Sequence, residues 1–315
     1  MEVCDCNVSL SNTGRPDCVP MQDAAKRLIL VSLQQADGTL NEIDLATAAL
    51  DQAEINALIN NADELARWFP IGDILNVEES RGESVVEEFN DGSKVKIEDG
   101  VKTFTGIFAK ATPDFLRKIK EWGCVKPGAF VVDKQGNLIG DRTSSDGKLR
   151  PIPINANTWD PKYIPATDTT VPKIQLDFEW RRDFSDTALG MLLNSDFASG
   201  VDLLDEDGLI DLFGTILTSP APIATGLTID IFTDYGSAKG RKAVSGLDLV
   251  TDFDVVASTS GVTAIATSVE DATIKGRYAI TFTSLSLEDV YVQKKAATLG
   301  YSDTNLITEV ATLTT

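Results

Sequence analysis

Strict alternation of apolar and polar side chains in residues 174–180 is the feature that most constrains how this chain folds. The apolar positions are Ile174, Leu176, Phe178 and Trp180, and the polar positions between them are Gln175, Asp177 and Glu179. Successive side chains of a β-strand point to opposite faces of a sheet. The pattern therefore predicts a strand with one buried face and one solvated face.

Residues 101–141 predict further elements of the same fold. Residues 101–110 alternate like a second strand, and two apolar runs around a turn at 133–137 are typical of a β-hairpin. Between the strand and the hairpin, Thr112 can cap a helix and Gly123 can end it. We therefore predict a mainly β fold with a few helices, of the α+β class, in which a helix packs on a β-sandwich or barrel-like domain.

Two helices are predicted, near residues 52–69 and 113–122. Apolar residues recur at helical spacing in the first segment, and Pro70 ends it. In the second segment, Pro113 suits the first helical position and Asp114 complements the positive end of the helix dipole. The apolar stripe of the second helix consists of Phe115, Leu116, Ile119 and Trp122.

A second hairpin is predicted over residues 85–97. Asp91 and Gly92 lie between two alternating runs, which is a strong signal for a tight turn. The charged residues that can pair across its strands are Glu87, Glu88, Lys94 and Lys96. Because such pairs contribute only about 0.2–1 kcal/mol each, they fix the register more than the stability.

A long polar segment, residues 141–170, follows the first hairpin. Segments of this length in a compact domain are usually functional or interfacial. Trp159 and Tyr163 lie within it and could bind a ligand. Since the sequence shows no other sign of a ligand site, we interpret them as a candidate contact between subunits.

The chain divides into four predicted parts. These are an N-terminal arm (1–25), a β domain (26–217), a linker (218–225) and a C-terminal β-sandwich (226–315). The last part contains short strands separated by Gly, Ser and Asp turns, which is the pattern of an immunoglobulin-like domain. It lacks the cysteine pair that stabilises antibody domains.

Composition argues against several functional classes. The chain carries 48 Asp and Glu against 28 Lys and Arg, so it repels nucleic acid phosphates. The acidic excess, most of which precedes residue 219, serves either solubility or a surface to which DNA must not adhere. Histidine is absent, which removes Ser-His-Asp, Cys-His and His-ligated zinc chemistry. The sequence therefore predicts no enzyme, no catalytic residues and no cofactor.

The four cysteines do not form a usual zinc pattern. Cys4, Cys6 and Cys18 lie in the N-terminal arm and Cys124 lies far from them. Reduced thiols are the default expectation, with a disulfide within the arm or a metal site as alternatives. Residues 202–210 resemble part of a calcium loop but lack two of its essential ligands, so we predict no metal site.

No apolar run is long enough for a membrane span, and the N-terminus has no secretory pattern. We therefore expect no membrane partner and synthesis in a cytoplasm.

Two groups of motifs resemble known virion proteins. Residues 104–140, together with 157–168 and 174–180, resemble the strand–helix–hairpin and following strands of tail tube proteins of long-tailed bacteriophages, especially phages that infect Bacteroidetes. Residues 243–253 and 276–281 resemble the immunoglobulin-like modules that are often appended to phage virion proteins.

The resemblance implies a structural role in a phage tail. Subunits would pair sheet edges in homo-oligomeric rings, expected to be hexameric, and the rings would stack into a tube with an acidic lumen. DNA would pass without specific binding, and other tail or connector proteins would be partners. The protein would belong to the virion tail and assemble in the host cytoplasm. The candidate lumen or ring-contact residues are Glu87, Glu88, Asp91, Lys94 and Lys96.

Three other functions remain open at this point. The chain could be a different virion part, such as a connector, capsid or decoration protein. It could also be a surface adhesin whose last domain binds glycans, or a hydrolase that uses carboxylates.

Overall fold

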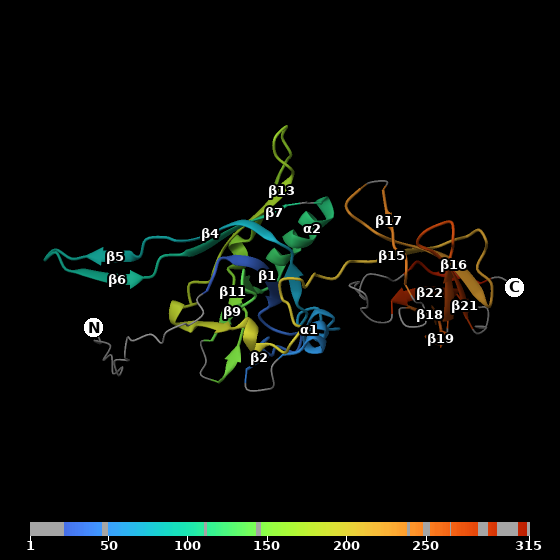
Figure 1. Cartoon of the computed structure of the whole chain (residues 1–315), viewed down its shortest axis with the longest axis horizontal. Coiled ribbons are helices and arrows are strands. Elements are labelled where there is room, and N and C mark those ends of the chain that lie inside the picture. The colour runs from blue at the N-terminus through green and yellow to red at the C-terminus, as the bar shows by residue number, and fades with distance from the viewer. Residues whose placement is uncertain are drawn as a thin grey trace.

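The computed structural model describes residues 22–45, 50–109, 112–142, 146–237, 240–247, 253–264, 266–282, 289–294 and 308–313. Within them the chain is mainly β with two α-helices, which confirms the predicted fold class. Figure 1 shows a central body, a long hairpin that projects from one side of it, and a second group of sheets on the other side. Three of the cysteines, Cys4, Cys6 and Cys18, lie outside the described residues, and Cys124 is exposed with a free thiol.

The body contains two main antiparallel sheets. The first has the order β14 (Leu189–Leu192), β9 (Leu138–Asp141), β8 (Pro127–Asp133), β1 (Ala25–Ser32) and β3 (Phe69–Ile71), and β11 (Ile152–Pro153) also pairs with β8. The second has the order β12 (Asp160–Ile164), β13 (Lys173–Glu179), β7 (Lys102–Ala109) and β4 (Ile74–Arg81). A short pair, β2 (Ile43–Asp44) and β10 (Lys148–Leu149), lies beside them.

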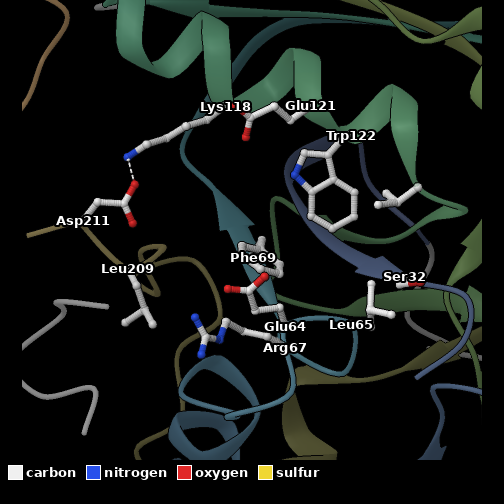
Figure 2. A pocket seen from close by; sticks show the side chains of 11 residues that line it. Ser32, Glu64, Leu65, Arg67, Phe69, Lys118, Glu121, Trp122, Leu209 and Asp211 are labelled. Carbon is white, nitrogen blue, oxygen red and sulfur yellow. Dashed lines mark ion pairs between the residues drawn. The ribbon is translucent and has the colours of Figure 1, made fainter. Parts of the chain in front are cut away.

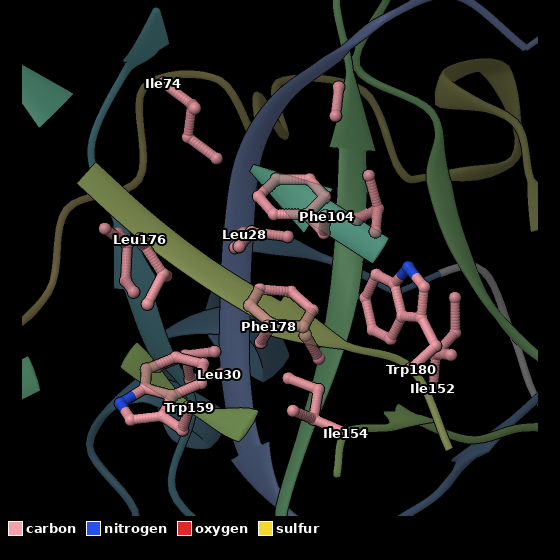
Figure 3. Packing of buried hydrophobic residues seen from close by; sticks show 14 of the residues in the cluster. Leu28, Leu30, Ile74, Phe104, Ile152, Ile154, Trp159, Leu176, Phe178 and Trp180 are labelled. Carbon is pink, nitrogen blue, oxygen red and sulfur yellow. The ribbon is translucent and has the colours of Figure 1, made fainter. Parts of the chain in front are cut away.

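The apolar face of β13 packs into the core between these sheets, as its alternation predicts. Ile174, Leu176 and Phe178 are buried there with Phe104 of β7. The rings of Phe104 and Phe178 stack with centroids 4.8 Å apart, and Trp180 meets Phe178 edge-on (Figure 3). Aromatic pairs of this kind add about 0.5–1.5 kcal/mol beyond their burial.

Helix α2 (Pro113–Glu121) begins as its sequence predicts. The Thr112 hydroxyl accepts a hydrogen bond from the Phe115 backbone N–H at 3.2 Å, and Pro113 occupies the first turn. Ile119 is buried in the body core. Gly123 does not form the predicted left-handed cap, because the chain continues directly into a 3-10 turn, η1 (Trp122–Cys124), in which its φ is not positive.

Helix α1 (Gln52–Ile59) is shorter than the segment predicted as helical. Its start is fixed by a capping box, in which Asp51 accepts from the Glu54 N–H and Glu54 accepts from the Asp51 N–H. Beyond Ile59, the side chains of Asn61 and Asp63 accept backbone hydrogen bonds and close turns in place of another helical turn. The helix covers the outer face of the first sheet.

The C-terminal sheets enclose a separate core. One has the order β15 (Phe213–Ile216), β16 (Gly226–Thr233), β21 (Arg277–Phe282) and β20 (Ala266–Glu270), and β17 (Lys242–Ala243) pairs with β16. The other has the order β19 (Thr263–Ala264), β18 (Phe253–Ala257), β22 (Asp289–Lys294) and β23 (Ala311–Thr312). Residues 218–225, the predicted linker, connect β15 to β16 within one sheet.

A buried carboxylate organises the turn between β8 and β9. Asp133 accepts hydrogen bonds from the backbone N–H groups of Asp23, Gln135 and Asn137 and from the Asn137 side chain. Burial alone would raise the pKa of Asp133, but these donors outweigh it and hold the pKa below its ordinary value.

We expect Asp133→Ala to lower the free energy of unfolding by about 2–4 kcal/mol, because it leaves buried donors without an acceptor. Since the folded-state pKa of Asp133 is lowered, its contribution is fully present above the unfolded pKa of about 3.9 and is lost as pH falls through the folded pKa. Chemical denaturation at neutral pH and at pH 3 measures both effects. Asp37→Ala is the control, since Asp37 makes the same kind of turn bonds to Thr39 in full exposure. An equal loss in both variants would contradict the assignment.

Candidate assembly interface

The projecting hairpin, residues 82–100, is called the arm. It consists of β5 (Val85–Glu88) and β6 (Lys94–Glu98), which pair with each other and with no other strand of the described chain. Figure 1 shows the arm extending from the β4 and β7 ends of the second body sheet, away from the C-terminal sheets. A two-stranded hairpin alone is marginally stable in water, so an extended arm of this kind is suited to contact a partner.

The turn of the arm follows the sequence signal. The Asp91 carboxylate accepts from the Ser93 N–H at 2.9 Å and from the Ser93 hydroxyl at 2.6 Å, and these bonds lower the pKa of Asp91. Gly92 has φ of 81°, a left-handed backbone conformation that residues with a side chain rarely adopt. The tip is therefore a defined turn that ends in a negative charge.

Only one of the possible lysine–glutamate pairs forms across the strands. Glu88 lies opposite Lys94, with 3.2 Å between carboxylate oxygen and ammonium nitrogen. Glu87 lies opposite Val95, and Lys96 pairs instead with Asp99. The turn closed by the Phe89 N–H bond to the Ser93 carbonyl fixes this register, and a register shift between Val85 and Val86 follows nearer the base of the arm.

The arm exposes apolar side chains. Val85, Val95 and Ile97 are 50%, 51% and 62% exposed, and the Phe89 ring near the tip is 41% exposed. Isolated exposed apolar residues are common, but their concentration on one slender hairpin marks a surface for contact. The same arm contains six acidic residues against two lysines, so a partner surface must accept both apolar and negatively charged groups.

The base of the arm is fixed by close backbone approach and ion pairs. A Cβ on Gly100 would overlap the carbonyl of Gly82, so the two strands approach this closely only because residue 100 is a glycine. Arg182 binds Glu98 at 2.6 Å, and Arg81 binds Asp99 at 3.2 Å. Sequence reasoning missed these two arginines, since no local pattern indicates a partner 84 residues away, as for Arg182, or across the base of the hairpin, as for Arg81.

The solvated side of the second body sheet is called the polar face. Its polar residues are Glu78, Ser80, Thr103, Thr105, Asp160, Lys162, Lys173, Gln175, Asp177 and Glu179, which share one side of the ladder by register with Leu75, Ile107 and Ile164. Asp177 is its centre, accepting from Thr105 at 2.9 Å, Gln175 at 2.9 Å and Lys162 at 2.7 Å. Burial would raise the pKa of Asp177, but these partners lower it, so the face keeps its negative charge.

Both ends of this sheet are free edges in the described part of the chain. The end strands are β4 and β12, and neither has a second strand partner. Such edges present unpaired backbone groups to another chain. A bulge between Leu75 and Glu78, with φ of 51° at Asn76, interrupts the β4 edge.

The two aromatic residues of the predicted inter-subunit contact differ in position. Trp159 is buried, stacks on Phe178 with centroids 5.5 Å apart, and donates from Nε1 to the Ile119 carbonyl at 2.7 Å. It packs inside its own subunit. Tyr163 lies on the free edge strand β12 and is 47% exposed, so it alone of the two is placed to meet a neighbour.

Within the described residues, no group of three or more His, Cys, Asp or Glu side chains is placed to hold a metal ion. Asp207, from the calcium-like segment, pairs instead with Arg27 at 3.2 Å. No helix of the described part is both long enough and apolar enough to cross a membrane. No protein-family model matches the chain, and no curated protein resembles it above the level expected by chance.

We expect the triple variant Val85→Ser, Val95→Ser, Ile97→Ser to leave the thermal midpoint of the dilute chain nearly unchanged, because these side chains already face water. Val31→Ser, in the fully buried part of β1, should lower the free energy of unfolding by about 2 kcal/mol or more. Differential scanning calorimetry compares the two. A large loss in the arm variant would show that the arm packs against its own body.

Proposed function

We propose that the chain is the tail tube subunit of a long-tailed bacteriophage. The observation that carries the proposal is the combination of a polar, acidic sheet face bounded by two free edges with a projecting arm that exposes apolar side chains. The first feature suits lateral closure into a ring, and the second suits contact between rings. This geometry agrees with the family that the sequence motifs resemble.

Lateral closure uses the two edges of one sheet. Edge β4 of one subunit would pair with edge β12 of the next, a heterologous contact that generates a ring. Six copies of a four-stranded sheet would close into a barrel of roughly 24 strands, wider than the barrels of about 16–18 strands that already enclose an aqueous channel. The edge strands, a liability in a monomer, become the assembly surface.

The polar face would line the channel. Its four carboxylates, at Glu78, Asp160, Asp177 and Glu179, outnumber its two ammonium groups, at Lys162 and Lys173. A negative lumen repels the phosphate backbone, so DNA passes without adhering. The apolar side of the same sheet is already filled by the body core and is not available to the channel.

The arm would contact the adjacent ring, and the C-terminal sheets would form an immunoglobulin-like module on the opposite side of the body. We assign no catalytic role to the chain, which contains no histidine, and place it in the virion tail after assembly in the host cytoplasm. Its remaining partners would be other tail or connector proteins.

Negative-stain microscopy of the purified chain tests this function. We expect rings or hollow fibres at high concentration. The arm variant Val85→Ser, Val95→Ser, Ile97→Ser should stop at single rings, because it removes the apolar contact between rings. The matched control is Val262→Ser, Val269→Ser, which removes exposed valines from the C-terminal sheets and should assemble normally. Monomers under all conditions would refute the proposal.

Labelling of assembled tubes tests which face lines the channel. A biotin attached at Ser80→Cys on the polar face should be inaccessible to streptavidin along the tube, because streptavidin is too large to enter the lumen. A biotin at Ala53→Cys on α1, on the far side of the body, should bind it along the whole length. Both variants carry serine at the four native cysteine positions. Equal decoration of the two would place the polar face outside the channel.

A further inference from the structure

The connection between the body and the C-terminal sheets is very short. Leu209 packs against the core beneath α1, and Leu212 is fully buried in the C-terminal core. Only Ile210 and Asp211 lie between these two anchors. The three Cα–Cα steps from Leu209 to Leu212 span roughly 11 Å at most, so the two parts must lie close together, but a short connector alone does not fix their angle.

An ion pair holds this connector to helix α2. The Lys118 ammonium lies 2.5 Å from the Asp211 carboxylate (Figure 2). It also lies 3.0 Å from the Asp114 carboxylate. Partial burial would lower the pKa of Lys118, but the two carboxylates raise it, so the lysine stays charged. Because Asp211 is only 18% exposed, water screens this pair less than an ordinary surface pair.

A second contact joins the turn after β16 to the first turn of the same helix. Gly236 has φ of 86°, and a Cβ there would lie 2.7 Å from the Pro113 Cβ and 2.8 Å from the Asp114 nitrogen. The turn therefore touches α2 backbone to backbone. Asp234 holds its shape by accepting from the Gly236 N–H at 2.7 Å.

Both contacts fall on one rigid element. Pro113 and Asp114 lie about one helical turn before Lys118, and α2 is anchored in the body by Ile119, whose carbonyl accepts from Trp159. Beside the ion pair lies a crease of about 360 Å³ between α2, β3 and the connector (Figure 2). The crease is lined by Phe69, Trp122 and Leu209 as well as the ion pair. Among the described residues no apolar cluster joins the body core to the C-terminal core, so the orientation depends there on these two small contacts.

We infer that these two contacts form a latch that holds the C-terminal sheets in one orientation on α2. Parts joined by small interfaces usually move relative to each other. The latch prevents this relative movement although it buries little surface. Loss of either contact would let the C-terminal sheets move relative to the body. The inference goes beyond the proposed function and does not depend on it.

Single-molecule energy transfer on the full chain tests the latch at concentrations too low for assembly. Dyes are placed at Lys134→Cys and Val262→Cys, both exposed, with the four native cysteines replaced by serine. We expect one narrow transfer-efficiency population for the otherwise unchanged chain. Gly236→Ala and Asp211→Asn should each broaden it and shift its mean.

The matched control is Gly246→Ala. Gly246 has φ of 81°, close to that of Gly236, but a Cβ there meets nothing within 4 Å. The Gly246→Ala substitution imposes similar backbone strain without contacting α2. The transfer-efficiency distribution of this variant should therefore stay narrow. Circular dichroism verifies folding of each variant, and Asp211→Asn decides the question if Gly236→Ala fails to fold. A broad distribution in the unchanged chain, or narrow unshifted distributions in both latch variants, would overturn the inference.

Discussion

The packing of β13 between two environments is the constraint on which the rest of the body depends. One side of the strand places Ile174, Leu176 and Phe178 in the core, and the other side holds Asp177 at the centre of a polar network. A register slip of one residue would exchange these sides, bury the carboxylate and expose the aromatic ring. The cost of burying an unpaired charge makes that slip prohibitive, so the core and the polar face are fixed by the same seven residues.

This coupling explains which parts of the fold could be predicted. Alternation in β13, the Thr112 cap of α2 and the Asp91–Gly92 turn are local signals, and local backbone physics decides them. The length of α1 could not be derived in this way. Apolar spacing continues past Ile59, but side-chain acceptors at Asn61 and Asp63 compete for the backbone and end the helix. At this point a few specific side-chain hydrogen bonds override the helix propensity of the segment.

The candidate interface was predictable in its residues but not in its geometry. The sequence indicates the hairpin, yet its direction depends on the Gly82–Gly100 crossing and on Arg182, which reaches Glu98 from another part of the chain. For Trp159, the local sequence context suggested a role that the folded structure does not give it. An aromatic residue in a polar segment favours an interfacial interpretation, whereas the stacking surface of Phe178 and the Ile119 carbonyl draw it into its own core. Long-range partners decide both cases, and a single sequence does not display them.

Helix α2 connects these arrangements mechanically. Its apolar stripe and the Trp159 hydrogen bond tie it to the core behind the polar face, while Asp114 and Lys118, beside the stripe, receive the Gly236 turn and the Asp211 carboxylate. A force on the C-terminal sheets is therefore transmitted to an element that is anchored next to the second body sheet. The arm leaves the body on the other side, where its ion pairs at Arg81 and Arg182 are independent of α2. The base of the arm is therefore anchored separately from the contacts that orient the C-terminal sheets.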